Sequence, residues 1–177
     1  MTIRDRNESK AITNNYERTN AAVIRSPNTY FQKGITFSRT GVYSPTFRFS
    51  SNSVYDTEGS IIFDNLELDI LQKNGVYSSI ILRYLVKNYI GHTVHCQVDE
   101  LKELPITIQL NNQITSLVER LVDKQKQNAR YEYMSHEQKE IDRLVYELYG
   151  LNKCDITEVE NWFARRYPKL ARFMEID

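Results

Sequence analysis

The sequence predicts an α+β protein, in which a small β-rich recognition domain is followed by a helical hairpin and a terminal helix. Between residues 23 and 63, Thr, Tyr, Phe, Val and Ser are interrupted by glycine and proline, a composition typical of short strands and turns. Beyond Asn111, apolar residues recur at spacings of three and four, as along one face of a helix. The 177 residues, 41% of them hydrophobic, suffice to bury a core. We expect three segments: a polar tail or connection (1–22), the β-rich domain (23–110) and a helical domain (111–177).

The N-terminal tail has neither the apolar stretch nor the small-residue cleavage site of a signal peptide. The mean hydropathy is −0.54, and charged residues interrupt the longest nearly apolar run, so no membrane span is expected. The two cysteines, Cys96 and Cys154, suit a reducing compartment better than a disulfide scaffold. We therefore expect a cytoplasmic protein that has no membrane partner.

The β-rich segment contains one clear strand and one clear turn. Phe47 and Phe49 alternate with Arg48, so the two rings share one face of a strand and the guanidinium lies on the other. Gly41 supplies the permissive backbone that a turn requires. We expect Arg39–Ser44 to form an exposed loop tip.

The middle of the chain predicts one helix and two further extended stretches. Ser79–Asn88 has helical periodicity, and Gly91 follows it where a glycine commonly ends a helix. Thr93–Val98 and Ile106–Leu110 alternate as strands do, and Pro105 disfavours helix at the residue before it. We therefore expect the β-rich domain to extend to residue 110.

The C-terminal third predicts a helical hairpin with a further helix packed on it. Ser135 and Gln138 form a capping-box pattern at one helix start, and Thr157 and Glu160 repeat it at the next. Gly150 ends the helix that begins near Ser135. Two apolar stripes are expected to pack together, at Ile114, Leu117, Val118, Leu121 and Val122 and at Ile141, Leu144, Val145 and Leu148.

Two clusters suggest metal chemistry, but neither has a convincing pattern. His92, His95 and Cys96 are good zinc ligand types, yet a four-ligand site lacks a suitably spaced fourth donor. Glu100 and Lys102 match half of a divalent-metal nuclease site, which also needs an upstream acid such as Asp64 or Asp69.

No nucleophile elbow or phosphate-binding glycine loop occurs. We therefore expect no catalytic residue, no metal site and no cofactor.

The remaining candidate is a recognition surface in the first part of the chain. Eight of the twenty aromatic residues lie between Tyr30 and Phe63, interleaved with Lys33, Arg39 and Arg48. Arginine can read guanine, lysine and hydroxyls can hold phosphates, and exposed aromatic rings can stack on bases. The net charge of the whole chain is zero, but residues 1–60 carry a surplus of three positive charges. Aromatic residues clustered in a β unit also commonly build its core.

The order of these residues resembles a known family. The stretches that carry the resemblance are YFQKGITFSRT at 30–40, Phe47-Arg48, VYDTEGSIIF at 54–63, IDRLVYELYGL at 141–151 and WFARRYP at 162–168. This order resembles the C-terminal target-recognition region of large adenine-specific DNA methyltransferases, namely type IIG restriction-modification enzymes and phage-exclusion methyltransferases. The resemblance covers about residues 23–170. The glycine-rich cofactor loop and the Asn-Pro-Pro-Tyr motif of such enzymes do not occur, so it implies the specificity part alone.

The resemblance implies that the chain recognises specific sequences in double-stranded DNA, with a methyltransferase or endonuclease domain or subunit as its partner. From their positions and chemistry, we expect Lys33 and Arg48 to contact phosphates or a groove of the DNA. The candidates for reading bases are the polar residues of the expected loop tip: Arg39, Thr40, Tyr43 and Ser44. Two alternatives stay open: a protein-interaction module that docks a partner through helices in 111–174, and a metal-dependent nuclease.

Overall fold

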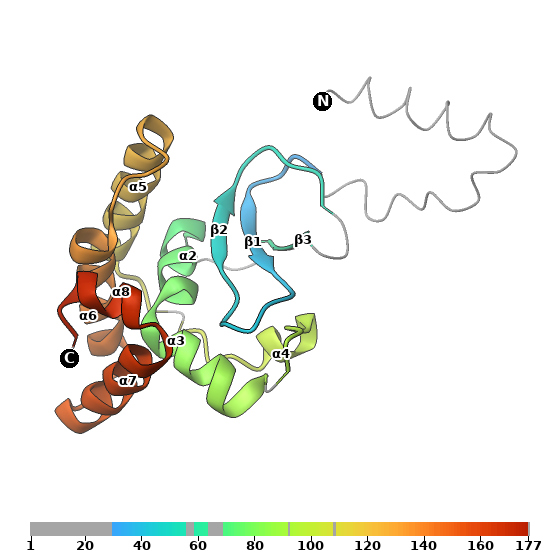
Figure 1. The fold of residues 1–177 in the computed structure, drawn as a ribbon. Coiled ribbons are helices and arrows are strands. Elements are labelled where there is room, and N and C mark those ends of the chain that lie inside the picture. Colours follow the sequence, from blue (N-terminus) through green and yellow to red (C-terminus); the bar gives the residue numbers. More distant parts are fainter. Residues whose placement is uncertain (1–29, 56–58, 64–68, 92, 108, 177) are drawn as a thin grey trace, which may run out of the picture. The chain divides into compact units, whose positions relative to one another are not determined.

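The computed structural model describes residues 30–55, 59–63, 69–91, 93–107 and 109–176 (Figure 1). Residues 31–177 form one compact unit. The expected boundary near residue 110 therefore falls inside this unit. The expected tail at 1–22, together with His92 and Asp64, lies outside the described residues.

The α+β class is confirmed. The described residues contain a three-stranded antiparallel sheet and seven α-helices. The strands are β1 (Gly34–Ser38), β2 (Phe47–Ser50) and β3 (Gly59–Ile62). The helices, two of which adjoin a five-residue π-helical turn, are α2 (Ile70–Ser78), α3 (Ile80–Leu85), α4 (Val98–Lys102), α5 (Asn112–Gln127), α6 (Lys139–Leu148), α7 (Lys153–Arg166) and α8 (Pro168–Met174). None of them is long and apolar enough to cross a membrane.

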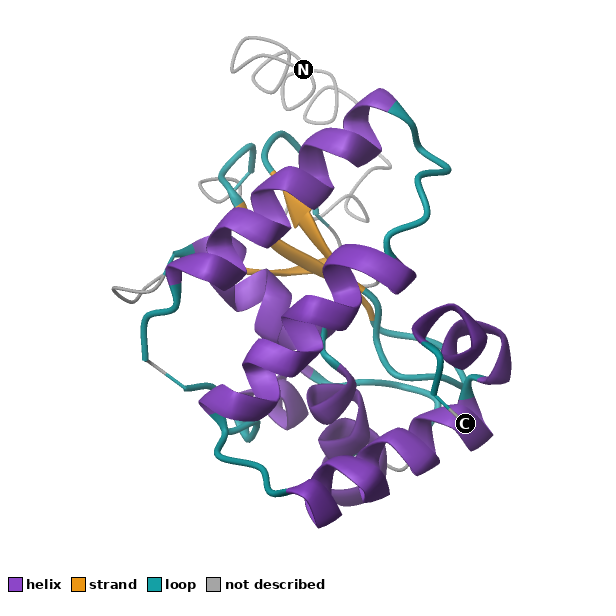
Figure 2. Ribbon diagram, turned by 90° about the vertical axis from the view of Figure 1, so that its left-hand side faces the viewer, coloured by secondary structure: helices purple, strands orange, loops and turns teal. Residues whose placement is uncertain are grey.

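The sheet has the order β2-β1-β3, and its alternation matches the expected strand. Thr36 of β1 lies opposite Arg48 of β2, whose side chain is exposed. Phe47 is buried and stacks on Tyr77 of α2, with 4.9 Å between ring centroids. Figure 2, viewed from the α5 side, shows the long helices in front of the strands. One face of β2 therefore packs on helix, as the alternation of Phe47 and Arg48 predicts.

Helix α2 was not expected, and it shows why the β-rich segment is shorter than predicted. Its start is capped by Asp69, whose carboxylate accepts a hydrogen bond from the Leu71 N–H at 2.8 Å. Gly75 lies against α5, and an added Cβ would lie 2.7 Å from Ile114 Cγ2. The helix is thus stabilised by close packing on α5, which its weak local periodicity does not reveal. No strand beyond Ile62 occurs among the described residues.

The expected strand at 93–98 is wrong. Only one isolated bridge forms there, between Thr40 and His95, and α4 begins at Val98. The expected helix near 79–88 is confirmed as α3, which continues through a π-helical turn at Val86–Ile90 and ends before Gly91. The residues at 93–98 alternate as a strand does, although they form only one bridge. The sequence pattern alone could therefore not distinguish an isolated bridge from a regular strand.

Helices α6 and α7 start at residues other than those that the two capping patterns indicated. Before α6, the Glu132 carboxylate, not Ser135, accepts the N–H groups of Met134 and Ser135. Helix α7 begins after Asn152, whose side chain accepts the N–H groups of Cys154 and Asp155 at 2.8 and 3.1 Å. Asparagine is as good a cap as serine or threonine, so both capping predictions were wrong.

The expected single terminal helix is two helices. α7 ends at Arg166 and α8 begins at Pro168, because the residue before a proline is disfavoured in helical conformation. The C-terminal end of α6 is as expected, with Gly150 at a φ of +66°.

The apolar stripes of the helices meet in a continuous core. Ile114 and Val118 of α5 are buried, as are Ile141, Leu144 and Val145 of α6. The outer positions of both stripes, at Leu117, Leu121 and Leu148, are only partly buried. The same core includes residues of the sheet, so the sheet and the C-terminal helices stabilise one unit together.

Candidate nucleic-acid interface

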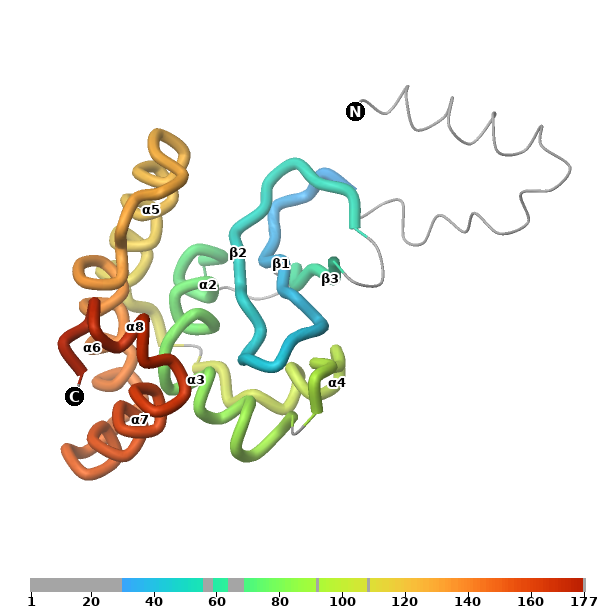
Figure 3. Tube along the Cα trace, in the orientation of Figure 1, coloured from blue at the N-terminus to red at the C-terminus, as the bar shows by residue number. Residues whose placement is uncertain are grey.

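The connection between β1 and β2 is attached to the segment that follows the π-helical turn. The Cys96 N–H donates to the Arg39 carbonyl at 2.7 Å, and the Gly41 N–H donates to the Val94 carbonyl at 2.8 Å. Arg39 Nη2 donates to Gln97 Oε1 at 2.8 Å. Figure 3 shows this connection, in blue, running beside the green chain between α3 and α4. The loop tip is therefore packed against its neighbours over its first half.

Ser44 is buried, which corrects its expected place at an exposed tip. Its backbone N–H donates to the Tyr167 hydroxyl at 2.9 Å, and its Oγ donates to the Arg83 carbonyl at 3.1 Å. Only 8% of its surface is exposed. Ser44 therefore holds the loop onto α3 and onto Tyr167, which lies between α7 and α8, so it is not a candidate for reading bases.

The crest of the loop is apolar and exposed. Val42 and Tyr43 are 63% and 58% exposed. The Tyr43 ring lies 5.2 Å from that of Tyr167 and 5.8 Å from the Arg166 guanidinium carbon, measured to its centroid. Arg166 Nη2 also donates to the Val42 carbonyl at 2.9 Å. A cation thus fixes an exposed aromatic ring at the crest.

Three cations around the loop are bonded to neutral oxygen atoms. Arg83 Nε donates to the Ser78 carbonyl at 3.2 Å, Lys87 Nζ to the Thr93 carbonyl at 3.2 Å, and Arg166 to Val42. None of the three forms an ion pair with a described residue. We call the surface formed by the loop 39–46 and these three cations the basic face.

The charges of the basic face act on one another. The pKa of the Lys87 ammonium is lowered, first by burial and then by the nearby Arg166 guanidinium, while Glu100 and the Cys96 thiol oppose the shift. Burial also raises the pKa of the Cys96 thiol to about 11, so this cysteine is a thiol at neutral pH. The positive charge here is therefore only weakly compensated.

The structure brings together four of the six predicted site residues. Arg39, Thr40 and Tyr43 lie in the loop with the buried Ser44. Arg48 is exposed on the outward face of β2, and Lys33 is exposed just before β1, at the strand end away from the loop. Lys33 is therefore separate from the basic face.

Sequence reasoning missed Arg83, Lys87 and Arg166, which come from α3, the π-helical turn and α7. Their distance along the chain leaves no local motif. The only available signal was the pair of arginines in Trp162–Pro168, one of the stretches that carried the family resemblance.

The residues considered for metal chemistry have other roles. Asp69 caps α2, and Glu100 accepts the Gln97 N–H at 2.7 Å at the start of α4. Lys102 pairs with Asp99 at 2.7 Å. Within the described ranges, no three His, Cys, Asp or Glu side chains are grouped so that they could hold a metal ion. The arrangement therefore gives the nuclease alternative no support.

Searches of known protein families and of curated proteins find no match to this chain.

Proposed function

We propose that the chain is a recognition module for double-stranded DNA and acts with a methyltransferase or endonuclease partner. The observation that carries the proposal is the basic face, where three cations bond only to neutral groups around an exposed loop. A polyanion gains most from such charges, because no local carboxylate has to be displaced. The resemblance to target-recognition regions supplies the partner class.

Within this proposal, the cations bind the phosphate backbone of the DNA, and the loop recognises its base sequence. In this proposal Lys87 and Arg166 contact phosphates, and Arg83, which like Lys87 is half-buried, adds to the local field. Thr40 and Tyr43 are exposed at the loop and are the base-reading candidates, together with Arg39 after release from Gln97. Arg48 and Lys33 would touch phosphates only if the duplex extends along β2 or β1.

The test is binding of the full chain to a pool of random duplexes by fluorescence anisotropy, at several salt concentrations. We expect weak binding that falls as salt rises. Arg166→Gln and Lys87→Gln should each lower the slope of log affinity against log salt by about one. Arg143→Gln is the matched control, because its charge is already neutralised by Glu140 and Glu147.

The outcomes separate the candidate functions. Equal slopes for Arg166→Gln and Arg143→Gln would remove the basic face from the interface. Absence of binding at low salt would refute DNA recognition and leave the docking of a protein partner.

A sequence-specific role has a different signature. After selection of a preferred duplex, Arg39→Ala should weaken binding to it by about 1 to 3 kcal/mol and change binding to random DNA little. A uniform loss on all duplexes would reassign Arg39 to the DNA backbone.

The proposal assigns catalysis to the partner. Incubating the chain with S-adenosylmethionine, magnesium and mixed duplexes should give neither methylation nor cleavage. Cleavage that disappears in Glu100→Ala would instead establish the nuclease alternative.

A further inference from the structure

A cavity lies among α6, α7 and the residues around α8, and it shares no lining residue with the basic face. Its volume is about 410 Å³. The residues that line it are His136, Lys139, Glu140, Asp142, Arg143, Tyr146, Ile156, Glu160, Met174 and Ile176. Polar groups from α6 and α7 thus face an apolar wall formed by Ile156, Met174 and Ile176.

Tyr146, which lines this cavity, has a buried hydroxyl without a hydrogen-bond partner among the described residues. Its side chain is 4% exposed. A hydroxyl buried without a partner destabilises a protein, because it loses water and gains nothing in return. Such groups are few in native proteins, and each requires an explanation, of which a bound water or ion is one.

Glu160 lines the same cavity from α7. No hydrogen bond or ion pair joins it to another described residue, and burial raises the pKa of its carboxyl. Lys139 opposes that shift at longer range. A carboxyl group and a hydroxyl, each without a hydrogen-bond partner among the described residues, therefore belong to two residues that line the same cavity.

The other charged residues of the cavity already have partners. Lys139 Nζ lies 2.6 Å from Glu175 Oε2, and Arg143 pairs with Glu140. Both oxygens of Asp142 are used: Oδ1 accepts the Ile80 N–H at 2.7 Å, and Oδ2 accepts Gln138 Nε2 at 3.1 Å. The ligand that best complements the cavity is thus a positively charged donor of hydrogen bonds.

We propose that this cavity binds a primary ammonium group carried on an aliphatic chain. The ammonium donates to the Glu160 carboxylate and the Tyr146 hydroxyl, and the aliphatic chain packs on the wall of Ile156, Met174 and Ile176. A cation is favoured over an anion, because among the acidic residues that line the cavity Glu160 is the one without a partner in the described part of the chain. A free alkyl diamine and the lysine side chain of a partner protein share this chemistry.

The test is calorimetric titration of the full chain with cadaverine, and separately with Nα-acetyl-lysine methylamide. We expect both to bind. Tyr146→Phe and Glu160→Gln should each weaken binding about tenfold or more, the usual effect of losing a hydrogen bond to a charged group. Tighter binding of the lysine derivative assigns the ligand to a protein partner, and tighter binding of cadaverine assigns it to a free diamine.

Glu158→Gln is the matched control, because it removes the same charge from an exposed position of α7, where the carboxylate bonds Tyr84. It should leave amine affinity unchanged. Thermal unfolding without ligand checks that the variants fold: Tyr146→Phe should not lower the melting temperature, since it removes an unpartnered hydroxyl.

Three results would each overturn the proposal. They are no binding of either amine at about 10 mM, equal affinity in Tyr146→Phe and wild type, and equally tight binding of pentanol, which lacks the charge.

Discussion

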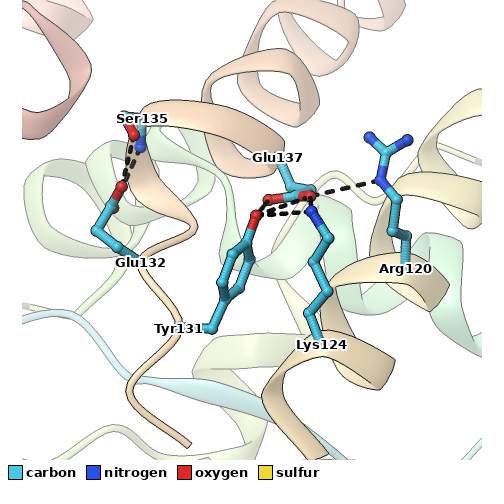
Figure 4. A network of polar contacts seen from close by, with 6 residues as sticks. All are labelled: Arg120, Lys124, Tyr131, Glu132, Ser135 and Glu137. Atoms are coloured by element: carbon cyan, nitrogen blue, oxygen red, sulfur yellow. Dashed lines mark hydrogen bonds and ion pairs between the residues drawn. The ribbon is translucent and has the colours of Figure 1, made fainter. Parts of the chain in front are cut away.

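The basic face and the region between α5 and α6 handle charge in opposite ways. Around the loop, Arg83, Lys87 and Arg166 bond only to neutral carbonyl oxygens. Between α5 and α6, one carboxylate collects several donors: Glu137, with a side chain 2% exposed, lies 2.9 Å from Lys124 Nζ and 3.4 Å from Arg120 Nε (Figure 4).

The Glu137 network also includes Tyr131, whose hydroxyl donates to Glu137 Oε2 at 2.9 Å. This network ties α5 to the turn before α6. Beside it, the Glu132 carboxylate accepts the Ser135 hydroxyl and caps the same turn. Each of these charged groups has an ion-pair or hydrogen-bond partner within the chain.

The difference separates structural charges from charges available to a ligand. Removing a partner from a buried carboxylate that meets two cations and a hydroxyl destabilises the fold, and such a carboxylate has little left to offer a ligand. Cations that bond only to carbonyl oxygens keep most of their field for a ligand. We therefore expect changes on the α5–α6 side to affect stability, and changes on the basic face to affect binding.

The largest effect is expected from Leu144→Ala. Leu144 is 3% exposed in the core shared by α5 and α6, so the variant should lose about 2 to 5 kcal/mol of unfolding free energy in urea. DNA affinity should be unchanged at temperatures where the variant is folded. A loss under about 0.5 kcal/mol would mean that this stripe faces a partner, and would shift the docking role to the helices.

The pH dependence of the unfolding free energy should reveal the raised pKa of Asp142. Burial raises the pKa of this carboxyl to about 7, although hydrogen bonds from Ile80 and Gln138 oppose the shift. This folded-state pKa lies above the ordinary value of about 3.9. The contribution of the Asp142 carboxyl to the unfolding free energy is therefore complete below about pH 4 and is lost as pH rises through 7.

Wild type should therefore lose stability relative to Asp142→Asn between about pH 4 and 7, by up to about 1.4 kcal/mol per pH unit. Urea unfolding at closely spaced pH values measures the difference. Parallel curves for the two proteins would show that the carboxyl of Asp142 has its ordinary pKa in the folded protein.

Glu137 should show the reverse dependence. Burial alone would raise the pKa of its carboxyl, but hydrogen bonds from Lys124 and Tyr131 outweigh burial and lower it. Its stabilisation is therefore present above about pH 4.3 and lost as pH falls through the lowered value.

Glu137→Gln should cost about 1 to 3 kcal/mol at pH 7, and less near pH 3. Glu140→Gln is the control: Glu140 forms an exposed pair with Arg143, worth about 0.5 kcal/mol or less. Equal losses in the two variants would contradict the structural role of the Glu137 network.

The smallest change in stability is expected on the basic face. Lys87→Gln removes a charge that bonds a carbonyl and lies near another cation, so its unfolding free energy should change by about 0.5 kcal/mol or less. Its DNA affinity should nevertheless fall. A large loss of stability with unchanged affinity would place Lys87 among the structural charges and erase the contrast between the two regions.

The sequence by itself determined the features that depend on local periodicity. The α+β class, the alternation of Phe47 and Arg48, the end of a helix at Gly150 and the stripes of α5 and α6 all follow from neighbours within a few residues. Lys33, Arg39, Thr40, Tyr43 and Arg48 were likewise nominated from one stretch of the chain.

Only the tertiary structure decided the features that depend on distant residues. Helix α2 is stabilised where Gly75 meets Ile114, the loop at 39–46 is held by Val94, Cys96 and Tyr167, and Ser44 is buried as a result. The cations of the basic face and the unpartnered pair of Tyr146 and Glu160 come from separate elements. Such groups leave no spacing to detect, because what unites them is packing between helices and the burial of their polar atoms.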